Sequence, residues 1–187
     1  MVASAGVAQA HPSTFLAFLA FLAPAVLYVY VVSVMSWRRD WAVNKGRAAA
    51  WTAVLVVGAA AALGLWILAR PSFAAAFWPP VQSIPRALLQ VAGNAPLGTS
   101  PAVAISLLVV LGVVLAARRR RSWWLIGVLL VAALLFVAVS SFPAGRLRYL
   151  LSGTWYSDSY RLAALLPVAV LKRRVKERWL RPNWAAT

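Results

Sequence analysis

The chain has 187 residues, of which 63% are hydrophobic and 12% are charged, and its mean hydropathy is +0.80. Soluble domains are about half apolar and about a quarter charged, and disordered chains are poor in hydrophobic residues, so both classes are excluded. Nineteen Lys and Arg against three Asp and Glu give a net charge of +16. No nucleic-acid partner is predicted, because these basic residues lie between long apolar runs, where membrane topology accounts for them.

Four long apolar segments predict transmembrane helices. Residues 14–35 carry no charge, and about 20 apolar residues are enough to cross a bilayer as a helix. A secretory signal peptide is a poorer interpretation of this segment, because no basic region precedes it. Three further spans are predicted at 48–69, 101–117 and 123–142. The fold class expected is therefore all-α, a polytopic transmembrane helical bundle with membrane lipids as its surroundings.

The end of the chain departs from this pattern. Residues 162–171 are apolar, but ten helical residues cover only about 15 Å, roughly half of a bilayer core. They predict a partial fifth span that completes a membrane domain of residues 1–171. The basic tail that follows, 172–187, is expected to lie along anionic lipid.

The second span contains small residues at helical spacing. Gly58 and Ala62, and Ala60 and Gly64, are each four residues apart, which lets two helix backbones approach closely in lipid. Chance pairs in an Ala-rich segment are the other interpretation. In the Pro-rich loop 70–100, residues 84–91 predict one or two helical turns on the membrane surface.

The loops alternate in charge, which predicts an orientation. Loops 36–47 and 118–121 together carry eight Lys and Arg, whereas loops 70–100 and 143–161 carry five. The positive-inside rule places the first pair in the cytoplasm. The expected protein is a multi-pass protein of the cytoplasmic membrane, with His11 and the Asp158 loop outside.

The segment Trp155-Tyr156-Ser157-Asp158-Ser159-Tyr160-Arg161 is the strongest candidate site. A carboxylate between aromatic rings and a guanidinium suits a sugar or phosphate head group, so Trp155, Tyr156, Asp158 and Arg161 are candidate binding residues. A purely structural role is the alternative. Asp158 would then cap a helix, Arg161 would be its i,i+3 partner, and Trp155 would sit at the membrane interface.

Two other positions are weaker candidates for a binding site. His11 is the single histidine and is a candidate for phosphate binding, although Ser13 beside it could equally cap the first helix. Arg118–Arg121 could attract anionic lipid, although its ordinary role is to hold a short loop in the cytoplasm. One His and no Cys cannot supply a metal site, so no metal and no cofactor are expected.

Several local patterns together resemble a known family. They are Ala10–Ser13 (AHPS), the Trp-Pro-Pro turn at Trp78–Pro80, the arginine-rich short loops, and Pro143–Val168 with its Trp-Tyr-x-Asp-x-x-Arg centre. The chain resembles the C-terminal part of a family of large actinobacterial polytopic membrane proteins that is similar to GT-C glycosyltransferases. The resemblance implies a cell-envelope role on the outer face, with a polyprenyl-phosphate sugar or glycan as ligand.

The departures from that pattern define what the chain is expected to do. Members of the family are several times longer, and the catalytic acid of GT-C enzymes lies in an early outer loop that has no acid here. A truncated copy, not catalytic alone, is therefore expected, with its catalytic residues unknown. The alternatives are a structural or assembly subunit of a larger membrane protein, and a small transporter.

Overall fold

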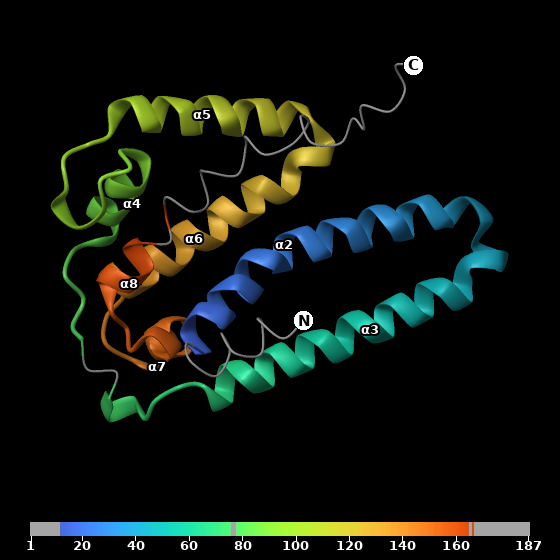
Figure 1. The fold of residues 1–187 in the computed structure, drawn as a ribbon, viewed down its shortest axis with the longest axis horizontal. Helices are drawn as coiled ribbons and strands as arrows, with labels where there is room; N and C mark the ends of the chain where they lie inside the picture. The colour runs from blue at the N-terminus through green and yellow to red at the C-terminus, as the bar shows by residue number, and fades with distance from the viewer. Residues whose placement is uncertain (1–11, 76–77, 165, 167–187) are drawn as a thin grey trace, which may run out of the picture.

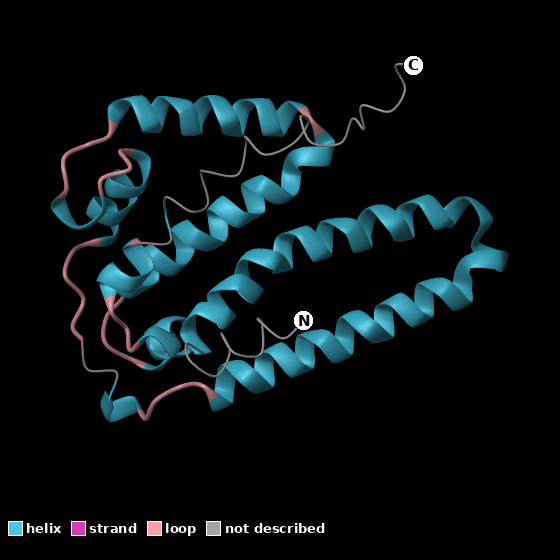
Figure 2. Ribbon diagram, in the orientation of Figure 1, coloured by secondary structure: helices cyan, strands magenta, loops and turns pink. Residues whose placement is uncertain are grey.

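A computed structural model describes residues 12–75, 78–164 and 166. Within these residues every regular element is a helix, which confirms the all-α class (Figure 2). His11, most of the predicted fifth span and the basic tail 172–187 lie outside the described residues. The α-helices are α2 (Pro12–Trp37), α3 (Trp41–Leu68), α4 (Ile84–Ala92), α5 (Val103–Arg118), α6 (Trp123–Ser141), α7 (Arg146–Ser152) and α8 (Ser159–Ala163). The short 3-10 turns are η1 (Arg38–Asp40), η2 (Phe73–Ala75), η3 (Pro96–Gly98), η4 (Arg120–Ser122) and η5 (Gly153–Trp155).

The long helices form two antiparallel hairpins. Helices α2 and α3 fold back on each other at η1, and α5 and α6 do so at η4 (Figure 1). A hydrogen bond of 2.8 Å between the hydroxyls of Tyr30 and Thr52 links α2 to α3. Each of the four predicted apolar segments is thus a helix, with the bounds given above.

Two helical runs are long and apolar enough to cross a membrane: Ser13–Leu68, which includes η1, and Arg120–Ser141. The 16 residues of α5 rise about 24 Å, which is short of the hydrocarbon core of about 30 Å. Large apolar side chains also cover the outer surface of α3 and α5; Val54, Val57, Leu107 and Leu108 are each about two-thirds exposed. The chain therefore has the character of a membrane protein, and the complete four-span bundle stays a prediction.

Helix α6 is the centre of the molecule. It packs against α2, α4, α5, α7 and α8, and its buried residues are concentrated in its second half, from Ala132 to Ser140. Two clusters of buried residues form the core on either side of it. The first contains Leu16, Ala17, Leu135, Val139, Trp155 and Leu162, and the second contains Ala87, Ala132, Phe136, Val137, Ala163 and Leu166.

Helices α2 and α6 approach each other closely at Gly127 and Pro24. A Cβ atom added to Gly127 of α6 would lie 2.7 Å from the Cβ of Pro24 in α2. By contrast, a Cβ added to Gly58 or Gly64 of α3 would meet nothing within 4 Å. The small-residue packing predicted for the second span is therefore absent from the described part of the chain, and a different glycine provides the close contact.

In Figure 1 the described loops around α4, α7 and α8 lie at one end of the molecule, and the α2–α3 and α5–α6 turns lie away from that end, apart from each other. We call the first the loop end; it comprises the described residues of segments 69–102 and 142–163. We call the two turns together the arginine end; it comprises η1 and η4, with Arg38, Arg39 and Arg118–Arg121. Which side of a membrane each end faces stays a prediction.

Helix α4 lies at the loop end and corresponds to the turns predicted at 84–91. Its small residue Ala87 is fully buried against α6, and Gln90 accepts a hydrogen bond of 3.0 Å from the backbone N–H of Leu97. Leu88 and Leu89 on the other face are exposed. The helix therefore presents an apolar surface outward while it covers one side of α6.

Candidate binding site at the loop end

The segment predicted to bind a ligand forms a tight turn before α8. Tyr156 and Ser157 have left-handed backbones, with φ of 58° and 54°. Asp158 then caps α8, because its Oδ1 accepts a hydrogen bond of 2.8 Å from the N–H of Tyr160. The other oxygen, Oδ2, lies 3.3 Å from Nε of Arg161. The cap and the i,i+3 ion pair that the spacing predicts are both present.

The structure brings together three of the predicted binding residues at the surface. The guanidinium of Arg161 lies 5.4 Å from the ring centroid of Tyr156, within range of a cation–π contact. Tyr156 is 44% exposed, and the side chains of Arg161 and Asp158 are 53% and 21% exposed. This exposed cluster of Tyr156, Asp158 and Arg161 is open to a ligand.

Trp155 points the opposite way, into the core. It is 3% exposed, and its indole N–H donates a hydrogen bond of 3.0 Å to the carbonyl of Ser13. Its ring meets that of Trp66 edge-on at 5.2 Å between centroids. Trp155 therefore holds the segment against the start of α2 and the end of α3, apart from the exposed cluster. His11 lies outside the described residues.

Arg148 is a central residue of this end that sequence reasoning missed. It is 3% exposed, and its Nε and Nη2 donate to the carbonyl of Val139, at 3.1 and 2.7 Å. Its Nη1 donates to the carbonyl of Trp78 at 2.6 Å, and Nη2 also donates to that of Ser157 at 3.3 Å. One guanidinium thus joins the end of α6, the 78–82 segment and the candidate binding segment.

The end of α6 explains why an arginine is buried here. Its last carbonyls have no partners within the helix and carry the negative end of the helix dipole, which favours a cation. Arg148 satisfies the carbonyl of Val139, while the N–H groups of Val81 and Gln82 satisfy that of Ser140. Burial lowers the pKa of Arg148 by desolvation, but an arginine side chain remains charged in a protein.

A cavity of about 250 Å³ lies beside this arginine. Tyr149 forms one wall of it: its hydroxyl donates to the carbonyl of Pro71 at 2.7 Å, and its ring meets that of Phe73 edge-on at 5.3 Å. The guanidinium of Arg70 lies 5.4 Å from the Tyr149 ring centroid. The residues lining the cavity are Phe73, Ala74, Trp78, Ala144, Gly145, Arg148, Tyr149 and Ser157. We call it the loop-end pocket.

The chemistry of the pocket suits a small polar head group. Its three aromatic residues offer faces on which a sugar ring can stack, and Arg148 brings a positive charge that no carboxylate neutralises among the residues described. Its volume is below the range of about 300–1,000 Å³ typical of pockets for drug-sized ligands. Ser157 is part of the lining, so the pocket adjoins the segment that carries the exposed cluster.

These features define an all-α protein of membrane character with a pocket at one end. The chain belongs to a family of unknown function, DUF6541, whose sequence profile matches residues 1–172. No curated protein and no solved structure matches the chain.

Proposed function

We propose that this protein is a multi-pass protein of the cytoplasmic membrane whose loop end faces outward and binds the head group of a lipid-linked sugar or glycan. The orientation is supported by charge, because loops 36–47 and 118–121 carry eight Lys and Arg, whereas loops 70–100 and 143–161 carry five. The ligand class is supported by the resemblance to GT-C-like envelope proteins and by the residues of the pocket. The long apolar tail of such a ligand would remain in the bilayer.

The observation that carries the proposal is the loop-end pocket itself. Aromatic walls supply stacking surface for a sugar, and Arg148 supplies a positive potential for the phosphate that joins it to lipid. The exposed Arg161 and Tyr156 lie on the segment that lines the pocket through Ser157 and would contact a longer glycan. The ligand would thus be held by charge at the phosphate and by aromatic contact at the sugar.

The proposed role is binding rather than catalysis by the described residues alone. General acid–base chemistry on a sugar needs a carboxylate that is free to exchange a proton. The described residues include two acids, and Asp40 belongs to the arginine end. Asp158 is held by its cap and by Arg161. We therefore propose that a catalytic acid, if the ligand is a substrate, is supplied from outside these residues.

Filling the pocket is expected to weaken ligand binding. Gly145 lines the pocket, its φ of 174° is open to any residue, and an added Cβ would find its nearest neighbour, the carbonyl of Pro143, at 3.9 Å. Gly145→Leu should therefore fold and should reduce binding by at least about tenfold, or about 1.4 kcal/mol. Binding of a polyprenyl-phosphate hexose to purified protein in nanodiscs, with melting temperature measured in parallel, tests this.

Two further variants sharpen the test. Gly112→Leu in α5 is the matched control, because an added Cβ there meets nothing within 4 Å and the residue is not part of the pocket lining. It should bind as wild type does. Arg161→Lys, which lacks the planar fork of arginine, should weaken binding of a longer glycan more than that of the hexose. Equal affinity of wild type and Gly145→Leu would contradict the pocket as the binding site.

A further inference from the structure

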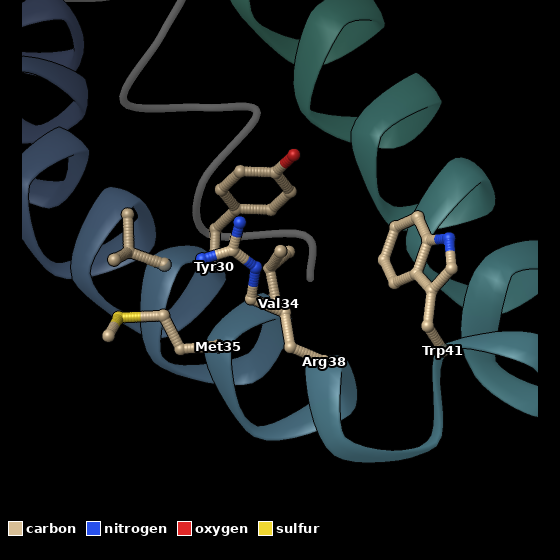
Figure 3. A pocket seen from close by; sticks show the side chains of 6 residues that line it. Tyr30, Val34, Met35, Arg38 and Trp41 are labelled. Atoms are coloured by element: carbon tan, nitrogen blue, oxygen red, sulfur yellow. The ribbon is translucent and has the colours of Figure 1, made fainter.

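A second cavity lies at the arginine end, between the two arms of the first hairpin. Its volume is about 530 Å³, and Tyr30, Val31, Val34, Met35, Arg38 and Trp41 line it (Figure 3). Four of these residues belong to α2, Arg38 begins η1, and Trp41 begins α3. We call this cavity the interhelical pocket.

The geometry of the hairpin explains the cavity. The hydroxyls of Tyr30 and Thr52 hold α2 and α3 together at 2.8 Å, about two helical turns before α2 ends. Beyond that contact the chain reverses through the three residues of η1, and the space between the helices is lined by side chains from both sides. In Figure 3 the guanidinium of Arg38 points back from the turn toward the side of Tyr30, with Trp41 across the gap.

Arg38 is not neutralised by an ion pair within the described residues, although Asp40 lies two positions further along η1. The single ion pair found among the described residues joins Asp158 to Arg161 at the loop end. Arg39 and Arg118–Arg121 add further positive charge at the arginine end. The occupant of the pocket should therefore carry negative charge.

The remaining walls indicate the rest of the occupant. Val31, Val34 and Met35 form an apolar side that continues into the exposed apolar surface of α2, where Val29 and Val32 are about half exposed. Trp41 is half exposed and lies across the gap from these residues (Figure 3), and tryptophans are common at the level of lipid head groups. A free anion would contact the arginine and leave this apolar side bare, and a second copy of the chain would bring its own positive charge.

We propose that the interhelical pocket binds one molecule of an anionic phospholipid, with its phosphate at Arg38 and an acyl chain along Val31, Val34 and Met35. Basic pockets between membrane helices are known to take anionic head groups in this way. This site rests on the membrane placement in the proposed function, but it is separate from the loop-end pocket and does not depend on sugar binding there. The bound lipid would fill the interhelical pocket beside the turn of the hairpin.

The test compares lipids that differ only in head-group charge. Native mass spectrometry of the purified protein should show one retained molecule of phosphatidylglycerol and weaker retention of phosphatidylcholine with the same chains. Arg38→Gln should weaken phosphatidylglycerol binding about fivefold or more. Arg119→Gln removes the same charge from an exposed position outside the pocket and should leave binding unchanged.

Two additional arms separate this lipid from other occupants. Excess inorganic phosphate should not displace phosphatidylglycerol, because it cannot replace the apolar contact. Val34→Phe fills the apolar side of the pocket and keeps Arg38, and it should reduce lipid retention. Two results would overturn the proposal. Equal weakening of lipid binding by Arg38→Gln and Arg119→Gln would show that only the diffuse positive charge of this end attracts the lipid. Displacement of the lipid by phosphate would show a simple anion site.

Discussion

Arg148→Met is expected to destabilise the protein by about 3–5 kcal/mol, because it removes a buried donor group that three backbone carbonyls share. The side chain donates to the carbonyls of Val139, Trp78 and Ser157, and each would lose a buried partner. Unsatisfied buried polar groups cost about 1–3 kcal/mol apiece. Methionine keeps most of the length and the apolar stem of arginine. The loss of stability would therefore come from the missing hydrogen bonds and the missing charge. Thermal unfolding in mild detergent measures it.

The neighbouring arginine provides the control. Arg146 lies on the same helix, α7, but is exposed, and Arg146→Met should change stability by about 0.5 kcal/mol or less. Arg148→Lys should fall between wild type and Arg148→Met, because one ammonium group cannot reach three carbonyls in the fork geometry of a guanidinium. Similar unfolding curves for Arg148→Met and Arg146→Met would show that Arg148 does not hold these segments together.

Gly127→Ala is expected to separate α2 from α6 and to cost about 1–3 kcal/mol, the usual range for an overpacked contact. The added Cβ would lie 2.7 Å from the Cβ of Pro24 and 3.3 Å from its Cγ. A proline ring cannot rotate away, so the helices themselves have to move. Because α6 is the centre of the fold, the same shift would disturb the core cluster that contains Leu16 and Leu135. Thermal unfolding in mild detergent is again the measurement.

Alanine substitutions at glycines with open surroundings distinguish the cost of the steric clash from the effect of helix propensity. Gly58→Ala and Gly112→Ala meet nothing within 4 Å and should be neutral or slightly stabilising, because alanine is the better helix former. In a Pro24→Gly background, which lacks the clashing Cβ, the cost of Gly127→Ala should largely disappear. A Gly127→Ala protein as stable as Gly58→Ala would contradict the close α2–α6 crossing.

The sequence predicted the long helices because their signal is local. An uninterrupted apolar segment such as 14–35 or 123–142 identifies a helix wherever it lies in space. The same holds for the Asp158 cap and its pair with Arg161, which depend on residues two and three positions apart. The pairing of the loops into two ends follows from the alternation of the helices.

The residues that shape the pocket could not be found in this way. Arg146 and Arg148 look equivalent in the sequence, and only the position of the end of α6 makes one of them buried. Likewise Gly58, Gly64 and Gly127 are all small residues in apolar helices, and the placement of Pro24 selects one. Trp155 is an expected binding residue that tertiary packing places in the core, through its contacts to Trp66 and Ser13.

The two ends of the molecule are expected to lie on opposite sides of the membrane, with the loop end outside. The chain has no cysteine, so single cysteines are clean probes. Ser83 is exposed at the loop end, and Ser122 is half-exposed at the arginine end, whereas Ser157 is too buried to label. An impermeant thiol reagent on intact cells should label Ser83→Cys, and should label Ser122→Cys only after the membrane is permeabilised. Labelling of Ser122→Cys in intact cells, with Ser83→Cys protected, would contradict an outward-facing binding site.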